Sequence, residues 1–387
     1  MPTTTRARRI AGCLGLLLLA TGCGGSRPAR PAAADASPLP AAPTSAAAQL
    51  AKLTPDQLAG QRVVYSYQGP TPPEQLLTAV RTGRAAGVIF FGGNTADPEQ
   101  FHAAVAALKQ AQQDSPVHQP LLLMTDQEGG LVRRLPGAPD LSERAVGTAP
   151  DPAAAATSAG ALAAANLTAY GLNVNLAPVL DVSHQDGDFI DQHQRSYGQD
   201  PAAVTALGRA FITAQQQGGV AATAKHFPGL GTTPAGADTD TGPVTLDVSK
   251  ARLTTVDEAP YPAAIAAGVD LVMLSWAVYP ALDAAHPAGL STTVVRGELR
   301  GRLGFKGVTV TDALEAGALA AYGDPGNRAV AAAGAGMDLL LCSAQDPNQA
   351  ADATAALADA LADGRLDHAE FTAAAARVTA LRASLGR

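Results

Sequence analysis

The segment Thr223-Ala-Lys-His-Phe-Pro-Gly-Leu-Gly231 combines small residues, two ionisable side chains and a turn-forming end. A buried strand is expected to end at Lys225 and His226, because Pro228 and Gly229 favour a turn directly behind them. Neighbouring residues on a strand point to opposite faces, so both side chains reach one pocket only if the strand ends there. In a barrel of parallel strands, the loops at this end of the strands build the binding site. The segment therefore predicts a barrel strand with a ligand-binding end.

Short apolar runs alternate with longer Ala-rich segments of helical character from about Leu50 onward. Several runs are continuous, as expected of parallel strands that are buried on both faces. The expected strands are Arg62–Tyr65, Gly87–Phe91, Leu121–Thr125, Val174–Ala177, Ala222–Lys225, Leu271–Leu274, Val308–Thr311 and Leu339–Leu341. Helices are expected at Pro98–Gln112, Pro152–Tyr170, Pro201–Gln217 and Asn348–Ala362. This alternation predicts an α/β fold with a single (β/α)8 barrel over residues 50–387.

An open, doubly wound sheet is the alternative, since it shares the same alternation of strands and helices. Such a sheet places a Gly-rich phosphate-binding turn after its first strand. The stretch Arg62–Pro70 contains no such turn, so the barrel is favoured.

The composition is that of a globular protein with an acidic surface. The 387 residues are enough for a barrel, which needs about 250. Hydrophobic residues make up 47% and charged residues 16%, which indicates a packed core rather than disorder. The net charge of −7 excludes a nucleic-acid partner, because such a surface needs clustered Lys and Arg.

The first residues have the pattern of an export signal and are not expected to belong to the folded domain. A basic start precedes the apolar run Ile10–Ala20, which is too short for a stable membrane span. Leu19-Ala-Thr-Gly-Cys23 resembles the end of a bacterial lipoprotein signal, so residues 1–22 are expected to be removed and Cys23 lipidated. An ordinary secretory signal is the alternative. The Ala/Pro-rich residues 23–49 are expected to form a disordered linker.

No disulfide or metal site is expected in the domain itself. Cys13 and Cys23 belong to the signal segment, so Cys342 is expected to pack as a small apolar residue. No Cys and His cluster has the spacing of zinc ligands. The loop His184–His193 is rich in His and Asp, but the irregular spacing favours a polar surface loop over a metal site.

Ionisable residues follow four of the expected strands and are candidates for chemistry. They are Asp126, Asp181, Asp312 and the pair Lys225-His226. In a barrel these strand ends converge on one face. Asp312 is the candidate nucleophile, because a carboxylate at a strand end can attack an anomeric carbon. A helix N-cap is the alternative role of this aspartate.

Other polar residues are expected to bind a ligand rather than react with it. Asp126 can accept hydrogen bonds from two adjacent sugar hydroxyls, whereas Glu128 is expected to point elsewhere. Arg133 or Arg134 is expected to contact a substrate or clamp Asp126, with a solvated arginine pair as the alternative. For His226 the alternative is a core histidine with satisfied hydrogen bonds.

Six short motifs follow one another along the chain. They are Gly87-Val-Ile-Phe-Phe91, Asp126-Gln-Glu-Gly-Gly130, Asn175-Leu-Ala-Pro-Val-Leu-Asp-Val182, Arg195-Ser-Tyr-Gly198, Lys225-His-Phe-Pro-Gly229 and Thr311-Asp312. In this order they resemble the β-N-acetylhexosaminidases of glycoside hydrolase family 3. The resemblance covers about Leu53 to Leu341.

The resemblance implies a single (β/α)8 barrel and a retaining mechanism without a metal or cofactor. By resemblance, Asp312 matches the aspartate nucleophile of the family. The residues that match those holding the sugar in the −1 subsite are Asp126, Arg134, Arg195, Lys225 and His226.

The chain departs from the family in the loop that usually carries the catalytic acid. The family has Lys-His-Phe-Pro-Gly-His-Gly and then Asp-Ser-His, in which the last histidine is the acid/base and the aspartate orients it. Here Leu230 replaces the first histidine, and Gly242 stands in place of the last one if Asp240 matches the aspartate. Asp238 and Asp240 are the candidates for the acid/base or its orienting partner, if desolvation raises a carboxyl pKa. Trp276 also replaces a histidine that is common in the family.

These features predict an exported monomer, lipid-anchored or secreted, that removes β-linked N-acetylglucosamine from cell-wall fragments through a glycosyl-enzyme on Asp312. Its partners are expected to be a carbohydrate and, through the lipid anchor only, a membrane. Because the loop histidine is absent, two alternatives remain: a catalytically weakened sugar-binding lipoprotein, and a family 3 transglycosidase or β-glucosidase-like enzyme.

Overall fold

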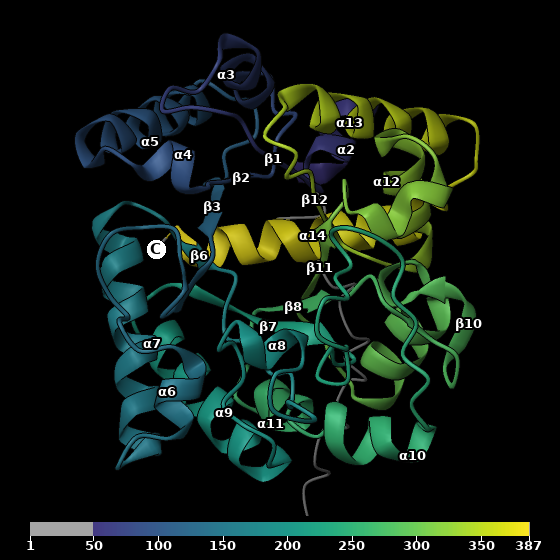
Figure 1. The fold of residues 1–387 in the computed structure, drawn as a ribbon. Coiled ribbons are helices and arrows are strands. Elements are labelled where there is room, and N and C mark those ends of the chain that lie inside the picture. Colours follow the sequence, from purple (N-terminus) through teal and green to yellow (C-terminus); the bar gives the residue numbers. More distant parts are fainter. Residues whose placement is uncertain (1–48, 387) are drawn as a thin grey trace, which may run out of the picture. The chain divides into compact units, whose positions relative to one another are not determined.

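Eight parallel strands close into a barrel in the computed structural model, which describes residues 49–386 (Figure 1). The bounds of these strands are β1 (Val63–Tyr65), β2 (Gly87–Ile89), β3 (Leu122–Thr125), β6 (Val174–Asn175), β7 (Ala221–Phe227), β8 (Leu271–Leu274), β11 (Val308–Ala313) and β12 (Leu339–Leu341). The first strand pairs with both β2 and β12, which closes the barrel and excludes the open sheet. The predicted barrel is confirmed, and all eight predicted strands are present with bounds that differ from the prediction by no more than two residues.

Helices between consecutive strands pack around the barrel (Figure 1). They include α3 (Glu74–Arg81), α5 (Pro98–Gln113), α7 (Pro152–Ala169), α9 (Pro201–Gln217), α11 (Tyr261–Ala266) and α12 (Pro325–Ala335). Helix α2 (Pro55–Gly60) precedes the first strand, and α13 (Pro347–Ala362) follows the last one. Short helical segments lie in the connections, among them α6 (Glu143–Gly147), α8 (Phe189–Gln192) and the 3-10 helix η4 (Gly317–Tyr322). The four predicted helices are confirmed to within one residue at each end.

An aspartate followed by a proline starts five of the longer helices. The capping residues are Asp97, Asp151, Asp200, Asp324 and Asp346. Each side chain accepts a hydrogen bond from a backbone N–H of the first turn, and the proline occupies a position where no N–H is needed. A cap of this kind contributes about 1 kcal/mol. Because these helices follow the loops at the carboxyl ends of the strands, the caps fix where each of those loops ends.

Apolar side chains fill the barrel interior and its amino-terminal end. The interior cluster includes Val64, Met124, Leu271, Val310 and Leu339. Val378 and Leu381 of α14 (His368–Leu385) belong to the same cluster. Arg382 of this helix donates hydrogen bonds to two backbone oxygens directly before β3. Helix α14 therefore covers the end of the barrel that lies opposite the predicted site.

Some predictions concern the amino terminus. The predicted signal segment 1–22, the lipidated Cys23 and the linker up to residue 48 lie outside the described residues.

Cys342, at the end of β12, is buried as predicted, and burial raises the pKa of its thiol. Among residues 49–386, no helix is both long and apolar enough to cross a bilayer.

Candidate active site

A cavity of about 510 Å³ lies at the carboxyl ends of the barrel strands. The predicted nucleophile and the predicted sugar-binding residues all line it: Asp126, Arg134, Arg195, Lys225, His226 and Asp312. Its volume lies within the range of about 300–1,000 Å³ that is usual for small-ligand sites. A larger hollow of about 700 Å³, at the opposite end of β3, contains none of these residues. Closure of the barrel thus brings together side chains that are far apart in the sequence.

Strand β7 carries two of these residues and does not end where the sequence predicts. It runs from Ala221 to Phe227 and so includes both Lys225 and His226. Its pairing with β8 shifts register between Ala224 and Phe227, and the Lys225–His226 peptide bond is cis. Both side chains nevertheless line the cavity, because the shift interrupts the regular alternation of the strand. The predicted strand end is therefore wrong, although both residues reach one pocket.

A buried ion network forms one wall of the cavity. The Lys225 Nζ atom lies 2.8 Å from Oδ1 of Asp126 and 2.6 Å from Oε1 of Glu128. Arg195 donates hydrogen bonds of 2.9 and 2.8 Å to the two oxygens of Glu128. Burial disfavours the ionised form of Glu128, but Arg195 and Lys225 hold its pKa well below the usual range. The prediction that Glu128 points elsewhere is wrong, since the buried Lys225 and the partly buried Arg195 share this carboxylate.

His226 is oriented by an aspartate whose role the sequence does not predict. Its Nδ1 lies 2.6 Å from Oδ2 of Asp181, and the other oxygen of Asp181 accepts a 2.7 Å hydrogen bond from the Leu230 N–H. The second ring nitrogen, Nε2, lies 3.5 Å from Arg195. Asp181 is buried, so this contact fixes the ring of His226 with Nε2 directed toward the ion network.

Asp312 lies on β11 near its end and is half-buried in the cavity wall. Its Oδ1 accepts a 2.8 Å hydrogen bond from the N–H of Ala313. The next helical segment, η4, begins only at Gly317, so Asp312 does not cap a helix. Trp276 is buried and donates a 2.8 Å hydrogen bond from Nε1 to the backbone oxygen of Ala313. The indole therefore supports the backbone that holds Asp312.

The two neighbouring arginines have different positions on the hairpin formed by β4 (Gln127–Gly129) and β5 (Val132–Arg133). Arg134 is half-buried and lines the cavity, and no hydrogen-bond partner of its Nε is found among the described residues. Arg133 is exposed and pairs with Asp140 at 2.6 Å. Of the two candidates, only Arg134 is placed to contact a ligand.

The loop after β7 places Asp238 and Asp240 at the mouth of the cavity. The Asp240 N–H donates a 2.9 Å hydrogen bond to Oδ1 of Asp238. Partial burial, the charge of Asp312 and the charge of Asp238 raise the pKa of Asp240 to about 6. Asp240 is itself exposed at the rim of the cavity. The structure thus brings two carboxyl groups of the loop to the side of the cavity that holds Asp312.

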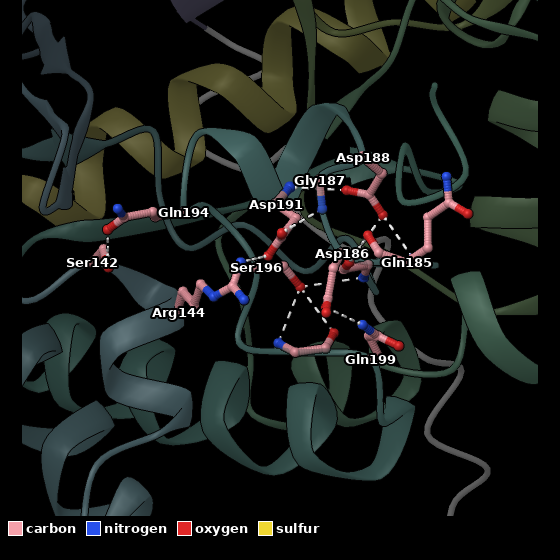
Figure 2. A network of polar contacts seen from close by, with 12 residues as sticks. Ser142, Arg144, Gln185, Asp186, Gly187, Asp188, Asp191, Gln194, Ser196 and Gln199 are labelled. Atoms are coloured by element: carbon pink, nitrogen blue, oxygen red, sulfur yellow. Dashed lines mark hydrogen bonds and ion pairs between the residues drawn. The ribbon is translucent and has the colours of Figure 1, made fainter. Parts of the chain in front are cut away.

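The loop between β6 and α9 is held by its own polar contacts (Figure 2). Asp188 accepts three hydrogen bonds from the turn before it and caps α8. Asp191 pairs with Arg144 of α6. Ser196 donates a hydrogen bond to the backbone oxygen of Asp181, in the segment after β6, which fixes the neighbouring Arg195. No three metal-ligating side chains cluster anywhere in residues 49–386.

The profile of the "Glycosyl hydrolase family 3 N terminal domain" matches residues 56–381. The chain belongs to glycoside hydrolase family 3. The resemblance seen in the sequence is confirmed, and the protein is accordingly a glycoside hydrolase.

The chain is similar to glycoside hydrolases of several organisms. An uncharacterized secreted glycosyl hydrolase of Arthroderma benhamiae is 45% identical over 84% of this chain and 93% of that protein. The structure of a family 3 β-N-acetylglucosaminidase from Paenibacillus sp. is 35% identical, with a TM-score of 0.80, over 87% of this chain and 64% of that one. A β-N-acetylhexosaminidase from Beutenbergia cavernae is also 35% identical, with a TM-score of 0.78, over 86% of this chain and 99% of that one.

We predict that Glu128→Gln strongly destabilises this family 3 barrel. The change leaves the buried Lys225 and the partly buried Arg195 with one carboxylate fewer, and breaking a buried ion network typically costs about 3–5 kcal/mol. Since the folded pKa of Glu128 lies below its ordinary value of 4.5, its stabilising contribution is present above that pH and is lost as the pH falls toward the folded pKa. The free energy of unfolding, measured with denaturant at pH 7 and pH 4, gives both effects.

Glu74→Gln is the matched control for this measurement. Glu74 pairs with Arg81 on the surface of α3, and its side chain is 75% exposed. Exposed ion pairs contribute about 1 kcal/mol or less. Equal losses of stability in the two variants would contradict the role of Glu128 as the shared carboxylate of the network.

Proposed function

We propose that the protein is a retaining exo-glycosidase that releases β-linked N-acetylhexosamine, and GlcNAc in particular. The supporting observation is that Asp312 shares one cavity with Asp126, Arg195, Lys225 and His226. A candidate nucleophile thus faces side chains that can hydrogen-bond several hydroxyls of one sugar ring. The similar β-N-acetylglucosaminidase and β-N-acetylhexosaminidase structures support the choice of an N-acetylated sugar.

In the proposed mechanism, Asp312 attacks the anomeric carbon and the bond from that carbon to the leaving oxygen breaks. The product of this step is a glycosyl ester, which water hydrolyses in a second step. The Oδ1 atom of Asp312 is occupied by the N–H of Ala313, so Oδ2 is the oxygen available for attack. The leaving oxygen receives a proton from an acid, which must come from the loop over the cavity.

Asp240 is the proposed acid/base, and Asp238 its orienting partner. A pKa near 6 leaves a useful fraction of Asp240 protonated at neutral pH, which an ordinary aspartate does not offer. Asp238 accepts the hydrogen bond from the Asp240 N–H and so holds the turn in which Asp240 lies. General acid assistance of this kind contributes a factor of about 10² to 10⁴ in rate.

We expect Asp312→Asn to reduce turnover to background, because an amide cannot form the glycosyl ester. The purified protein and the variant are assayed on 4-nitrophenyl β-GlcNAc and on a GlcNAc disaccharide. Absence of Asp312-dependent turnover of both, with GlcNAc still bound in calorimetry, would favour the sugar-binding alternative. Transfer to an added alcohol in place of hydrolysis would favour a transglycosidase, and faster turnover of 4-nitrophenyl β-glucoside a β-glucosidase-like enzyme.

We expect Asp240→Asn to slow hydrolysis of the disaccharide by about 10²- to 10⁴-fold and to slow hydrolysis of the activated aryl substrate much less. The acid must be protonated, so kcat/KM of the unmodified protein for the disaccharide should fall as the pH rises through about 6. This alkaline limb should disappear in the variant. A larger loss in Asp238→Asn would move the acid role to Asp238, and unchanged disaccharide turnover in both variants would refute the assignment.

We also propose that the protein is exported and anchored by a lipid on Cys23, so that cell-wall fragments are its substrates. The basic start, the apolar run and the small residues before Cys23 support this, as does similarity to a protein named as secreted. In a bacterial host with lipoprotein processing, Cys23→Ala should move the protein from the membrane fraction to the soluble fraction and abolish lipid labelling. An unmodified protein that is soluble and unlabelled would refute the anchor.

A further inference from the structure

The loop that carries Asp240 is attached to the chain segment that follows the nucleophile. The N–H of Gly317 donates a 2.8 Å hydrogen bond to the backbone oxygen of Asp240. The N–H of Ala318 donates a 3.0 Å hydrogen bond to the backbone oxygen of Thr239. Both donors lie in η4, the first helical segment after Asp312. Two backbone hydrogen bonds therefore connect the loop of the proposed acid to the segment that directly follows the proposed nucleophile.

The close approach between these segments requires a glycine at position 317. A Cβ atom there would lie 2.5 Å from the backbone oxygen of Thr241, 2.6 Å from its carbonyl carbon and 2.9 Å from the nitrogen of Gly242. These contacts are far inside van der Waals distance, and the opposing atoms are backbone, so no side-chain rotation relieves them. A methyl group at this position fits only if the loop moves away.

The turn 238–242 is bonded internally, so it is expected to move as a unit. The N–H groups of Thr241 and Gly242 both donate 3.1 Å hydrogen bonds to the backbone oxygen of Asp238. The side chain of Asp238 accepts the N–H of Asp240 in the same turn. A displacement at Thr241 is therefore passed on to Asp240.

We propose that Gly317 is a positioning residue for the acid/base: the absence of a side chain there lets the loop dock with Asp240 at the mouth of the cavity. The inference rests on the proposed role of Asp240. The nucleophile is held by other contacts, since Ala313 N–H binds the Asp312 carboxylate and Trp276 binds the Ala313 oxygen. A substitution at Gly317 should thus impair proton transfer and spare nucleophilic attack.

The test compares leaving groups in the full-length Gly317→Ala variant. A misplacement of about 1 Å costs up to about 10²-fold in rate, so kcat/KM for a GlcNAc disaccharide should fall by about 10- to 10²-fold. For 2,4-dinitrophenyl β-GlcNAc, which needs little protonation, the change should stay within about 3-fold. Across a series of aryl β-GlcNAc substrates, kcat/KM should depend more steeply on the pKa of the leaving group. A folding defect alone would lower kcat/KM for all substrates by the same factor.

Gly242→Ala is the matched control. It makes the same chemical change in the same contact region, but a Cβ atom at Gly242 meets no atom within 4 Å. Its activity on every substrate in the series should equal that of the unmodified protein. A loss of disaccharide turnover as large as that of Gly317→Ala would overturn the proposal, because the effect would then not come from the close approach at Gly317.

Asp240→Asn, measured on the same substrates, separates this inference from the proposed function. If Asp240→Asn steepens the leaving-group dependence and Gly317→Ala does not, the positioning role fails and the acid role stands. If Asp240→Asn leaves the dependence unchanged, the acid role itself fails. Hydrogen exchange on the unmodified protein tests the docking without any variant: the amides of Gly317 and Ala318 should be protected, and exchange at the rate of a free chain would overturn the proposal.

Discussion

Lys225 and Arg195 place two positive charges in the cavity wall at the carboxyl ends of the strands, and the site depends on how these charges are balanced. A buried cation without a partner is strongly destabilising. Burial alone would lower the pKa of Lys225, but Asp126 and Glu128 raise it above the ordinary value. Glu128 also binds Arg195 through both oxygens. Two cations and two carboxylates therefore balance in this wall, which suits recognition of an uncharged sugar by hydrogen bonds.

The fold was largely predictable because its strands are buried on both faces and so appear as continuous apolar runs. The Asp-Pro pairs predict the starts of several helices for an equally local reason. The aspartate accepts a hydrogen bond from an N–H of the first turn, and the proline occupies a position where no N–H is needed. The limits of the strands are less predictable. Strand β6 ends at Asn175 and not at the predicted Ala177. The residue after Ala177 is Pro178, which has no N–H to donate to a neighbouring strand. Strand β7 continues through Lys225 and His226 because a register shift allows it.

The site was predictable where a residue lies at or directly after the end of a buried strand, as Asp312 near the end of β11 and Asp126 after β3 do. Glu128 was missed although a signal exists: residues two apart on an extended chain point to the same side, so Glu128 follows Asp126 toward Lys225. Asp181 differs, because its contact with His226 joins distant parts of the chain. No local pattern relates these two positions, and the parallel pairing of β6 with β7 and the bridge between Val179 and Lys225 bring them together.

In the proposed mechanism, a carboxylic acid replaces the histidine that the family usually has in this loop. Burial and then the charge of Asp312 are the main causes that raise the pKa of Asp240. When Asp312 becomes an ester in the glycosyl-enzyme, its charge disappears, and the pKa of Asp240 falls. The group that gave a proton to the leaving oxygen is then ionised and can accept one from the incoming water. A two-step reaction needs no histidine here, provided that the loop remains docked close to the nucleophile.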